Sequence, residues 1–371
     1  MAYTTIDDPS TYFQIATWTG NGSSPSTITN DGNSNLQPDW VWHKARSDSG
    51  RSHYFHDSSR GFGAQKELTS DGDYTEDSDS HLTENHGYIA SASTDSFVLG
   101  AGATNDNYTN KNSSTYIAWQ WKANGGTTTS NGASGDIKAS VTQREDTAKF
   151  AMCTYTATGI NAGQSHRVNH GLGTTPHVMI FKSRGATGDW VVYHHKNTSA
   201  TETDYLVLNT TAGTADSANK FNDTAPNTSY ATIGGDDNIS SGTMMLYSFA
   251  EVQGYSKFGS YTGNGNADGP FVYLGFKPSF LVIKNTSDGN DQWLMWDNKR
   301  SVFNPADDYL EPSTQAAESA DSNWAIVDFV SNGFKLKSND ISHNQDTYSY
   351  IYMAFAESPF VSSEGVPCTA R

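Results

Sequence analysis

The chain has 371 residues, 12% of them aromatic, and a formal net charge of −17 at pH 7. A chain this acidic repels nucleic-acid phosphates and anionic membrane surfaces, so we expect neither as a partner. Its two cysteines, Cys153 and Cys368, are too few for a disulfide framework or a zinc site, and no apolar run reaches the length of a membrane span.

One short strand pattern recurs three times along the chain and divides it into modules. A proline is followed six residues later by a lysine, with a nearly all-apolar run between them, at Pro38–Lys44, Pro176–Lys182 and Pro278–Lys284. The apolar run predicts a strand covered on both faces, with the proline at its first residue, where a missing N–H costs nothing. We call it the lysine strand, and its recurrence predicts three versions of one module.

The first predicted module spans residues 1–122. Residues 1–15 are a leader that we expect to form an edge strand or to pair with a neighbouring subunit. An aromatic opening strand then runs into a Gly/Asn turn at Trp18–Gly22. After the lysine strand, a polar hairpin leads to a partner strand at Tyr54–Asp57, and an alternating aromatic closing strand ends the module at Tyr116–Lys122.

The join to the second module is the best linker candidate in the chain. Residues 123–149 are rich in Gly, Thr, Ser and Asn, a composition typical of linkers. The second module (150–253) and the third (254–360) repeat the order of the first, and a polar tail covers 361–371. Their partner and closing strands are predicted at Trp190–His194, Met244–Glu251, Trp293–Asp297 and Tyr350–Glu357.

Each module has five or more short strands with one buried face, and such a sheet must be closed by a second sheet. We therefore predict an all-β protein of three tandem antiparallel β-sandwich domains of jelly-roll or lectin type. The second and third modules are joined by only a few residues, so we expect a nearly fixed angle between them.

A polar pair recurs with the lysine strand. Lys44 pairs in this prediction with Asp57, and Lys284 with Asp297, with an arginine three residues after each aspartate. In the second module, His194 takes the place of the aspartate. A catalytic dyad and a structural ion pair or turn cap both fit the pattern. We favour the structural alternative, because active sites are seldom triplicated. The predicted repeat anchors are Pro38, Lys44, Asp57, Pro176, Lys182, Pro278, Lys284 and Asp297.

Metal sites are weakly indicated. Asp71–Asp79 is dense in carboxylates that could coordinate calcium, but its spacing is not that of an EF-hand, and a solvated acidic loop is the better interpretation. Gly234–Asp237 is a weaker case. His53 with His56, and His194 with His195, lie near hairpins without a third ligand at metal-binding spacing. We predict no metal and no cofactor.

Enzyme signatures are missing from the sequence. It has no Gly-x-Ser-x-Gly, phosphate loop or dinucleotide fingerprint, and its forty acidic residues give no basis for choosing a glycosidase pair. We predict no enzyme and no catalytic residue. The nine tryptophans lie on or beside predicted strands. We expect most in the core, and exposed ones to stack on sugar rings or fill a subunit interface.

The modules resemble a known group of proteins. The run Gly275–Lys284, followed by Trp293–Asp297, Gly333–Leu336 and Tyr350–Ala356, is similar to a β-sandwich module of tailed-bacteriophage virion proteins, namely tail fibres and surface proteins of phages that infect marine bacteria and cyanobacteria. The opening Trp18–Gly22 and the ending Gly365–Arg371 also look like such proteins. The resemblance covers nearly all of residues 15–371, and the second module departs from it at its opening and at His194.

The resemblance implies a non-enzymatic virion protein on the tail or capsid surface, made in the host cytoplasm without a signal peptide. As a fibre or spike adhesin it would contact a host-surface glycan or receptor. As a capsid decoration or tail adaptor its partners would be other virion proteins, and a polysaccharide-degrading enzyme is a lesser alternative. The chain has no heptad stretch or shaft repeat, so we expect a compact homo-oligomer, with a trimer favoured.

Overall fold

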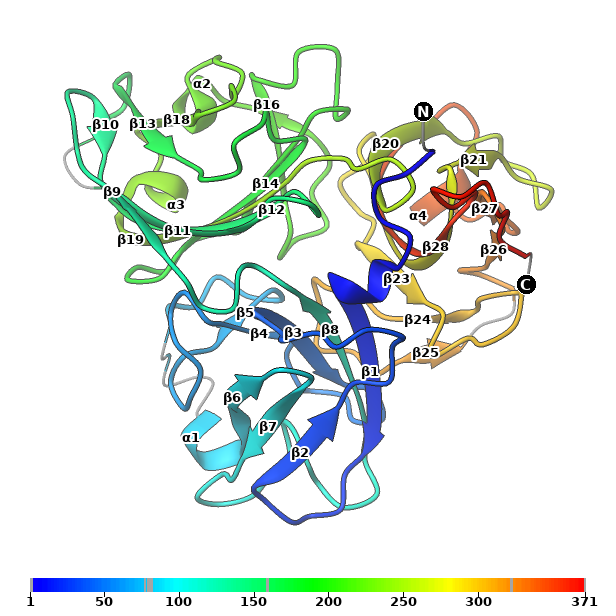
Figure 1. Cartoon of the computed structure of the whole chain (residues 1–371). Coiled ribbons are helices and arrows are strands. Elements are labelled where there is room, and N and C mark those ends of the chain that lie inside the picture. The colour runs from blue at the N-terminus through cyan, green and yellow to red at the C-terminus, as the bar shows by residue number, and fades with distance from the viewer. Residues whose placement is uncertain (1–2, 77, 79–82, 158–159, 321–322, 370–371) are drawn as a thin grey trace.

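A computed structural model describes residues 3–76, 78, 83–157, 160–320 and 323–369. The predicted fold class is confirmed: the chain is all-β and forms three modules, each a sandwich of a large antiparallel sheet and a smaller three-stranded sheet. Figure 1 shows the modules as three lobes around a common centre, the first in blue to cyan, the second in green and the third in yellow to red.

The first module has the sheet orders β1-β8-β3-β4-β5 and β2-β7-β6. Its elements are η1 (Pro9–Thr11), β1 (Phe13–Thr19), β2 (Ser26–Thr29), β3 (Trp40–Ala45), β4 (Tyr54–Asp57), β5 (Leu68–Thr69), α1 (Thr83–His86), β6 (Tyr88–Ser93), β7 (Ser96–Gly100) and β8 (Thr115–Trp121).

The second module has an eight-stranded sheet, β17-β16-β15-β14-β19-β12-β11-β9, and the small sheet β10-β13-β18. Its elements are β9 (Thr129–Asn131), β10 (Ile137–Lys138), β11 (Ser140–Glu145), β12 (Phe150–Ala157), β13 (Ser165–Asn169), β14 (Val178–Ser183), β15 (Val191–His194), β16 (Asp204–Val207), β17 (Ala215–Asp216), α2 (Ala218–Phe221), β18 (Tyr230–Gly234), α3 (Asp237–Ser240) and β19 (Gly242–Phe249).

The third module has the sheets β20-β28-β22-β23 and β21-β27-β26, with a two-stranded ribbon β24-β25. Its elements are β20 (Ser256–Thr262), β21 (Phe271–Tyr273), β22 (Phe276–Asn285), β23 (Leu294–Asp297), β24 (Asp308–Tyr309), β25 (Ser319–Ala320), β26 (Val327–Val330), β27 (Gly333–Leu336), α4 (Ile341–Asn344) and β28 (Ser349–Pro359).

All three large sheets share one strand order: opening, closing, lysine and partner strand. Equivalent residues are opposite one another in each register, as in Trp40 with Trp121, Val178 with Phe249, and Phe280 with Phe355. The repeat seen in the sequence is therefore also a repeat of pairing. In the third module, Pro278 lies inside β22 at a shift in register, where the missing N–H is tolerated.

The lysine strands are buried along nearly their whole length because each large sheet is covered twice. One face packs on the small sheet of its own module, and the other faces the centre of the molecule. Aromatic rings from different modules meet there: Trp40 lies 4.6 Å from Tyr247, Trp121 lies 6.0 Å from Phe280, and Phe249 lies 5.9 Å from a third-module ring, Phe355. Burying each such ring is worth about 1.5–3 kcal/mol, so the three modules share one central core.

The predicted linker needs correction. Within residues 123–149, β9 and β11 pair in the large sheet of the second module, and β10 joins its small sheet. Strand β11 covers β12, the opening strand of that module. The leader behaves differently: β1 lies at the edge of its sheet, and Thr4 donates a hydrogen bond to the O atom of Gln253, the last residue of the second module, at 2.8 Å.

Candidate functional site

The predicted pairing of strand lysines with aspartates is wrong. Asp57 lies opposite Trp40, at the other end of the hairpin from Lys44, because the register of β3 and β4 separates them. Lys182 Nζ donates instead to Asp73 O of the first module (3.0 Å) and Gly188 O (2.7 Å), and Lys284 Nζ donates to the carbonyls of Thr211 (2.8 Å) and Asp291 (2.6 Å).

The three lysines are structural. Lys44 Nζ donates to Ala45 O at 3.0 Å. Burial lowers the pKa of Lys44, Lys182 and Lys284 to about 8 each. Two of them donate to a backbone carbonyl of the preceding module, so the lysine strand is a joint between modules.

The two aspartates of the repeat each pair with the arginine three residues later. Arg60 Nε donates to Asp57 Oδ2 at 2.5 Å and Arg300 Nε to Asp297 Oδ2 at 2.6 Å, with all four side chains buried. Each carboxylate also accepts a hydrogen bond from another module: Asp57 from Tyr247 Oη (2.9 Å), and Asp297 from the first module's Trp119 Nε1 (3.3 Å). These are buried ion pairs that hold two modules together.

The third junction between modules is built differently. His194 replaces the aspartate, and its Nε2 lies 3.2 Å from Tyr352 O of the third module. Burial lowers the pKa of His194 to about 3, so its ring is neutral at pH 7. Met353 stands where Trp119 and Tyr247 stand at the other two junctions, and it has no hydrogen to donate to a carboxylate.

The predicted metal candidates serve structural roles. Asp71 accepts hydrogen bonds from Ser52 Oγ (3.0 Å) and His53 N (2.9 Å), and Glu76 forms ion pairs with Arg60 and Arg184. Asp77 and Asp79 lie outside the described residues. Among the residues that the structure describes, no group of three or more His, Cys, Asp and Glu side chains could hold a metal ion.

The other candidates are also accounted for. Asp236, in the Gly234–Asp237 segment, caps α3 and pairs with Lys220 at 2.6 Å. His53 Nδ1 accepts a hydrogen bond from Trp42 Nε1 at 3.0 Å, and the ring of His56 stacks on that of His43. Seven tryptophans are buried, as expected for core residues: Trp40, Trp42, Trp119, Trp121, Trp190, Trp293 and Trp296.

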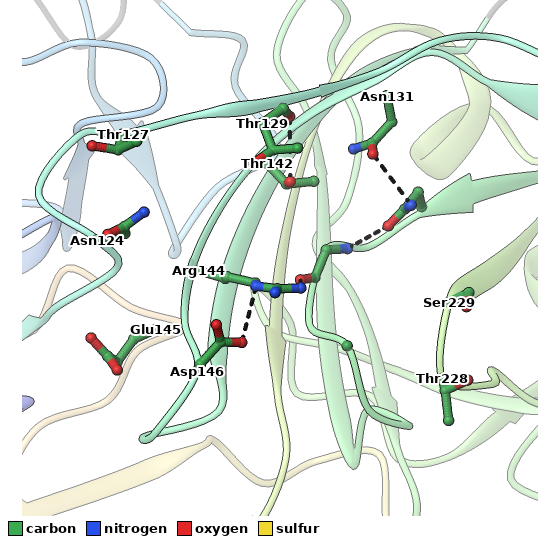
Figure 2. Close-up of a pocket in the computed structure, with 13 residues that line it drawn as sticks. Asn124, Thr127, Thr129, Asn131, Thr142, Arg144, Glu145, Asp146, Thr228 and Ser229 are labelled. Carbon is green, nitrogen blue, oxygen red and sulfur yellow. Dashed lines mark hydrogen bonds and ion pairs between the residues drawn. The ribbon is translucent and has the colours of Figure 1, made fainter.

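A candidate binding site emerges where the repeat is broken. In the part of the chain that the structure describes, modules one and three have no equivalent of β9–β11, and β9 and β11 form one wall of a polar cleft of about 500 Å³. The other wall is the loop after β13 and the loop before β18. Figure 2 shows the lining side chains. The lining consists of Asn124, Thr127, Thr129, Asn131, Thr142, Arg144, Glu145, Asp146, Asn169, Gly171, Gly173, Thr228 and Ser229.

Hydrogen bonds across the cleft fix its shape. Arg144 Nε pairs with Asp146 at 3.0 Å, and Arg144 Nη1 donates to Gly171 O at 3.3 Å. Asn169 Nδ2 donates to Asn131 Oδ1 at 3.4 Å. Gly171 has φ +75°, and a Cβ there would lie 2.6 Å from Thr142, so only glycine lets the loop approach β11 so closely. The two walls are thus pre-arranged.

The cleft offers hydrogen-bonding groups of both kinds. Its amides, hydroxyls, one guanidinium and two carboxylates supply donors and acceptors, and no aromatic or aliphatic side chain larger than threonine lines it. One arginine against two acidic residues leaves a net charge of about −1, which disfavours an anionic ligand. The sequence did not predict this cleft, because its lining consists of residue types that are common in any loop. The signal that it did contain was the extra length between the first and second lysine strands.

Comparison with known proteins gives one finding. A family model described as "Domain of unknown function (DUF7483)" matches residues 8–359, a range that includes all three modules. No curated protein matches the chain. No helix in the described part of the chain is long and apolar enough to span a membrane.

Proposed function

The chain belongs to the DUF7483 family of domains of unknown function, and we propose that it is a non-enzymatic surface protein of a tailed-bacteriophage virion that binds a neutral saccharide of the host surface. The virion context is supported by the resemblance of its modules to phage surface proteins. The binding role is supported by one observation, the polar cleft at the place where the second module departs from the repeat.

A saccharide fits the chemistry of this cleft. Sugar hydroxyls both donate and accept hydrogen bonds, and the lining provides partners for both. A repeated scaffold with one altered copy is a common way to place a site, because function is carried by local features that are added to a fold. The proposal includes no catalytic step: Arg144 pairs with Asp146, and Glu145 Oε1 accepts the backbone N–H of Thr147 at 3.0 Å.

The test is saccharide binding by the full chain. Arg144→Ala and Asn131→Ala should each weaken binding of host-surface polysaccharide fragments by about tenfold, since one lost hydrogen bond to a charged or amide group is worth about 1.5 kcal/mol. Thr262→Ala, in a polar groove between the second and third modules, is the matched control and should bind normally. Equal binding by all variants, or release of cleaved sugar, would contradict the proposal.

A second candidate is a capsid decoration or tail adaptor protein with a purely structural role. The shared central core favours it, because one rigid body of three modules suits a scaffold. Gold-labelled antibody on intact virions, viewed by electron microscopy, separates the two. Label on the tail or its fibres supports saccharide recognition, whereas label over the capsid supports the structural role. No label on virions would contradict both.

A further inference from the structure

The three opening strands occupy equivalent edges, and their backbone groups point outward at equivalent residues. Directly beyond the two ends of β1, Gly20 N donates to Ser114 O and Tyr12 O accepts from Lys122 N, so the even-numbered residues of β1 bond to β8. The N–H and C=O groups of Phe13, Ile15, Thr17 and Thr19 therefore point away from the sheet. The same reasoning assigns outward groups to Phe150, Met152 and Thr154 in β12, and to Ser256, Phe258 and Ser260 in β20.

In the second module, the chain itself covers this edge. Strand β11 adds antiparallel to β12, with Gln143 opposite Met152. The Gln143 side chain is buried, with its amide 2.9 Å from Ser58 Oγ and within 3.1 Å of Ala123 O. Backbone pairing and one buried amide side chain thus hold β11 in place.

In the third module, two side chains cover the edge. Phe258 N donates to Glu251 Oε1 at 2.9 Å, and His195 Nε2 lies 2.6 Å from Phe258 O. Phe258 is the equivalent of Met152, so these side chains satisfy the backbone groups that β11 satisfies in the second module. No additional strand is needed there.

In the first module, the edge is open. Within the described residues, no hydrogen bond reaches the N–H or C=O of Ile15, the residue equivalent to Met152 and Phe258. A groove of about 240 Å³ runs beside it. Ser279, Asn298 and Glu357 line this groove at the positions equivalent to Asp39, Ser58 and Ala123, and the last two of these lie within hydrogen-bond distance of the Gln143 side chain in the second module. The groove is therefore the counterpart of the space that β11 fills.

We propose that the β1 edge and this groove bind an extended segment of a partner protein. The segment adds antiparallel to β1 and places a glutamine-like amide side chain opposite Ile15, next to Asn298 and Glu357. This is strand addition, in which main-chain hydrogen bonds supply affinity and one side-chain pocket supplies specificity. The ion pair of Lys299 with Asp31 at 2.8 Å joins the two walls of the groove.

The test uses the full chain and a synthetic peptide with the sequence of residues 139–147, which includes β11. Hydrogen exchange is measured at single-residue resolution while the peptide is raised to millimolar concentration. The amides of Ile15 and Thr17 should exchange about tenfold more slowly when the peptide is bound, because only paired amides are protected. Gln14 and Ala16, already bonded to β8, should not change.

Two matched variants sharpen the test. A peptide with Gln143→Ala should need a higher concentration for the same protection. The protein variant Asn298→His places an imidazole at the position equivalent to His195, next to Glu357 at the position of Glu251, and should abolish the peptide effect. Unchanged exchange at Ile15, slow exchange there without peptide, or changes confined to β12 would each overturn the proposal.

Discussion

His194 shows how one residue of the repeat depends on the module beside it. Asp57 and Asp297 each accept a hydrogen bond from a tyrosine or tryptophan of another module. At the third junction, the equivalent position holds Met353, and a buried carboxylate there would lack its donor. The neutral ring of His194 avoids that cost.

We predict that His194→Asp lowers the free energy of unfolding by about 3 kcal/mol, because it buries a carboxylate without the arginine and the donor that the other two junctions provide. Adding Met353→Tyr should recover about 1 kcal/mol of this loss by supplying a hydroxyl donor. Urea denaturation of the single and double variants measures both effects, with Met353→Tyr alone as control. Strictly additive losses would show that the two positions do not interact.

The repeat anchors predicted the strands well, but not their partners. Proline and lysine at fixed spacing located β3, β14 and β22, since a buried strand leaves a local apolar pattern. The lysines bond to carbonyls of Asp73 and Thr211, which lie in other modules and have no spacing relation to the strand. Contacts between modules leave no periodic signal, so sequence reasoning joined Lys44 instead to Asp57, the residue that ends the next strand.

The strands β9 and β11 show the limit of composition at the level of elements. Both are polar, because much of their surface stays exposed beside the cleft, and β9 has no buried residue. An exposed edge strand therefore has the same composition as a linker, which explains the incorrect prediction for residues 123–149. The cleft was missed for the same reason.

Proline substitution should distinguish covered from open edges. Thr154→Pro removes an N–H that points to β11 and should destabilise the protein by about 3 kcal/mol. Thr17→Pro, at the equivalent residue of β1, removes an N–H that bonds to no strand and should cost about 1 kcal/mol or less. Thermal unfolding of the two variants makes the comparison. An equal loss of stability would mean that the β1 edge is paired in solution.

At the scale of the molecule, the three modules are one folding body. Their large sheets bury their central faces on each other, so an isolated module would expose the apolar face to which Trp40, Phe249 or Phe280 belongs. The sequence predicted strands that are buried on both faces, but it did not indicate which part of the chain packs on the second face. The expected homo-oligomer remains a prediction. Within one chain, the neighbouring modules already cover the central apolar face of each large sheet, which a second subunit would otherwise have to cover.

The buried histidines predict acid sensitivity of the whole fold. Burial lowers the pKa of His43 and His194 to about 3 and that of His343 to about 4, one group in each module. In the unfolded chain these groups take up protons near pH 6.5. The stability is complete above that pH and is lost as the pH falls toward 4, at about 1.4 kcal/mol per histidine and pH unit.

Urea midpoints at about pH 7.5 and about pH 5 test this dependence. The variant His43→Phe removes one of these groups from the interior of the first sandwich. Its unfolding should take up one proton fewer, so its free energy of unfolding should fall less steeply with decreasing pH. The ring nitrogens of His43 have no hydrogen-bond partner among the described residues, so the substitution breaks no polar contact. A midpoint that is independent of pH would contradict the assignment of neutral buried rings.

The three edges beside the opening strands differ although their strands are equivalent: one is paired with β11, one is capped by Glu251 and His195, and one is open. In an assembly of three identical subunits, any substitution appears in every copy at once. A single chain with three copies is free of that constraint. Each module has the same kind of contact with its neighbours, but its sequence can change independently of the other two. The molecule therefore keeps the rigidity of a symmetric assembly while the surfaces of its modules differ in function.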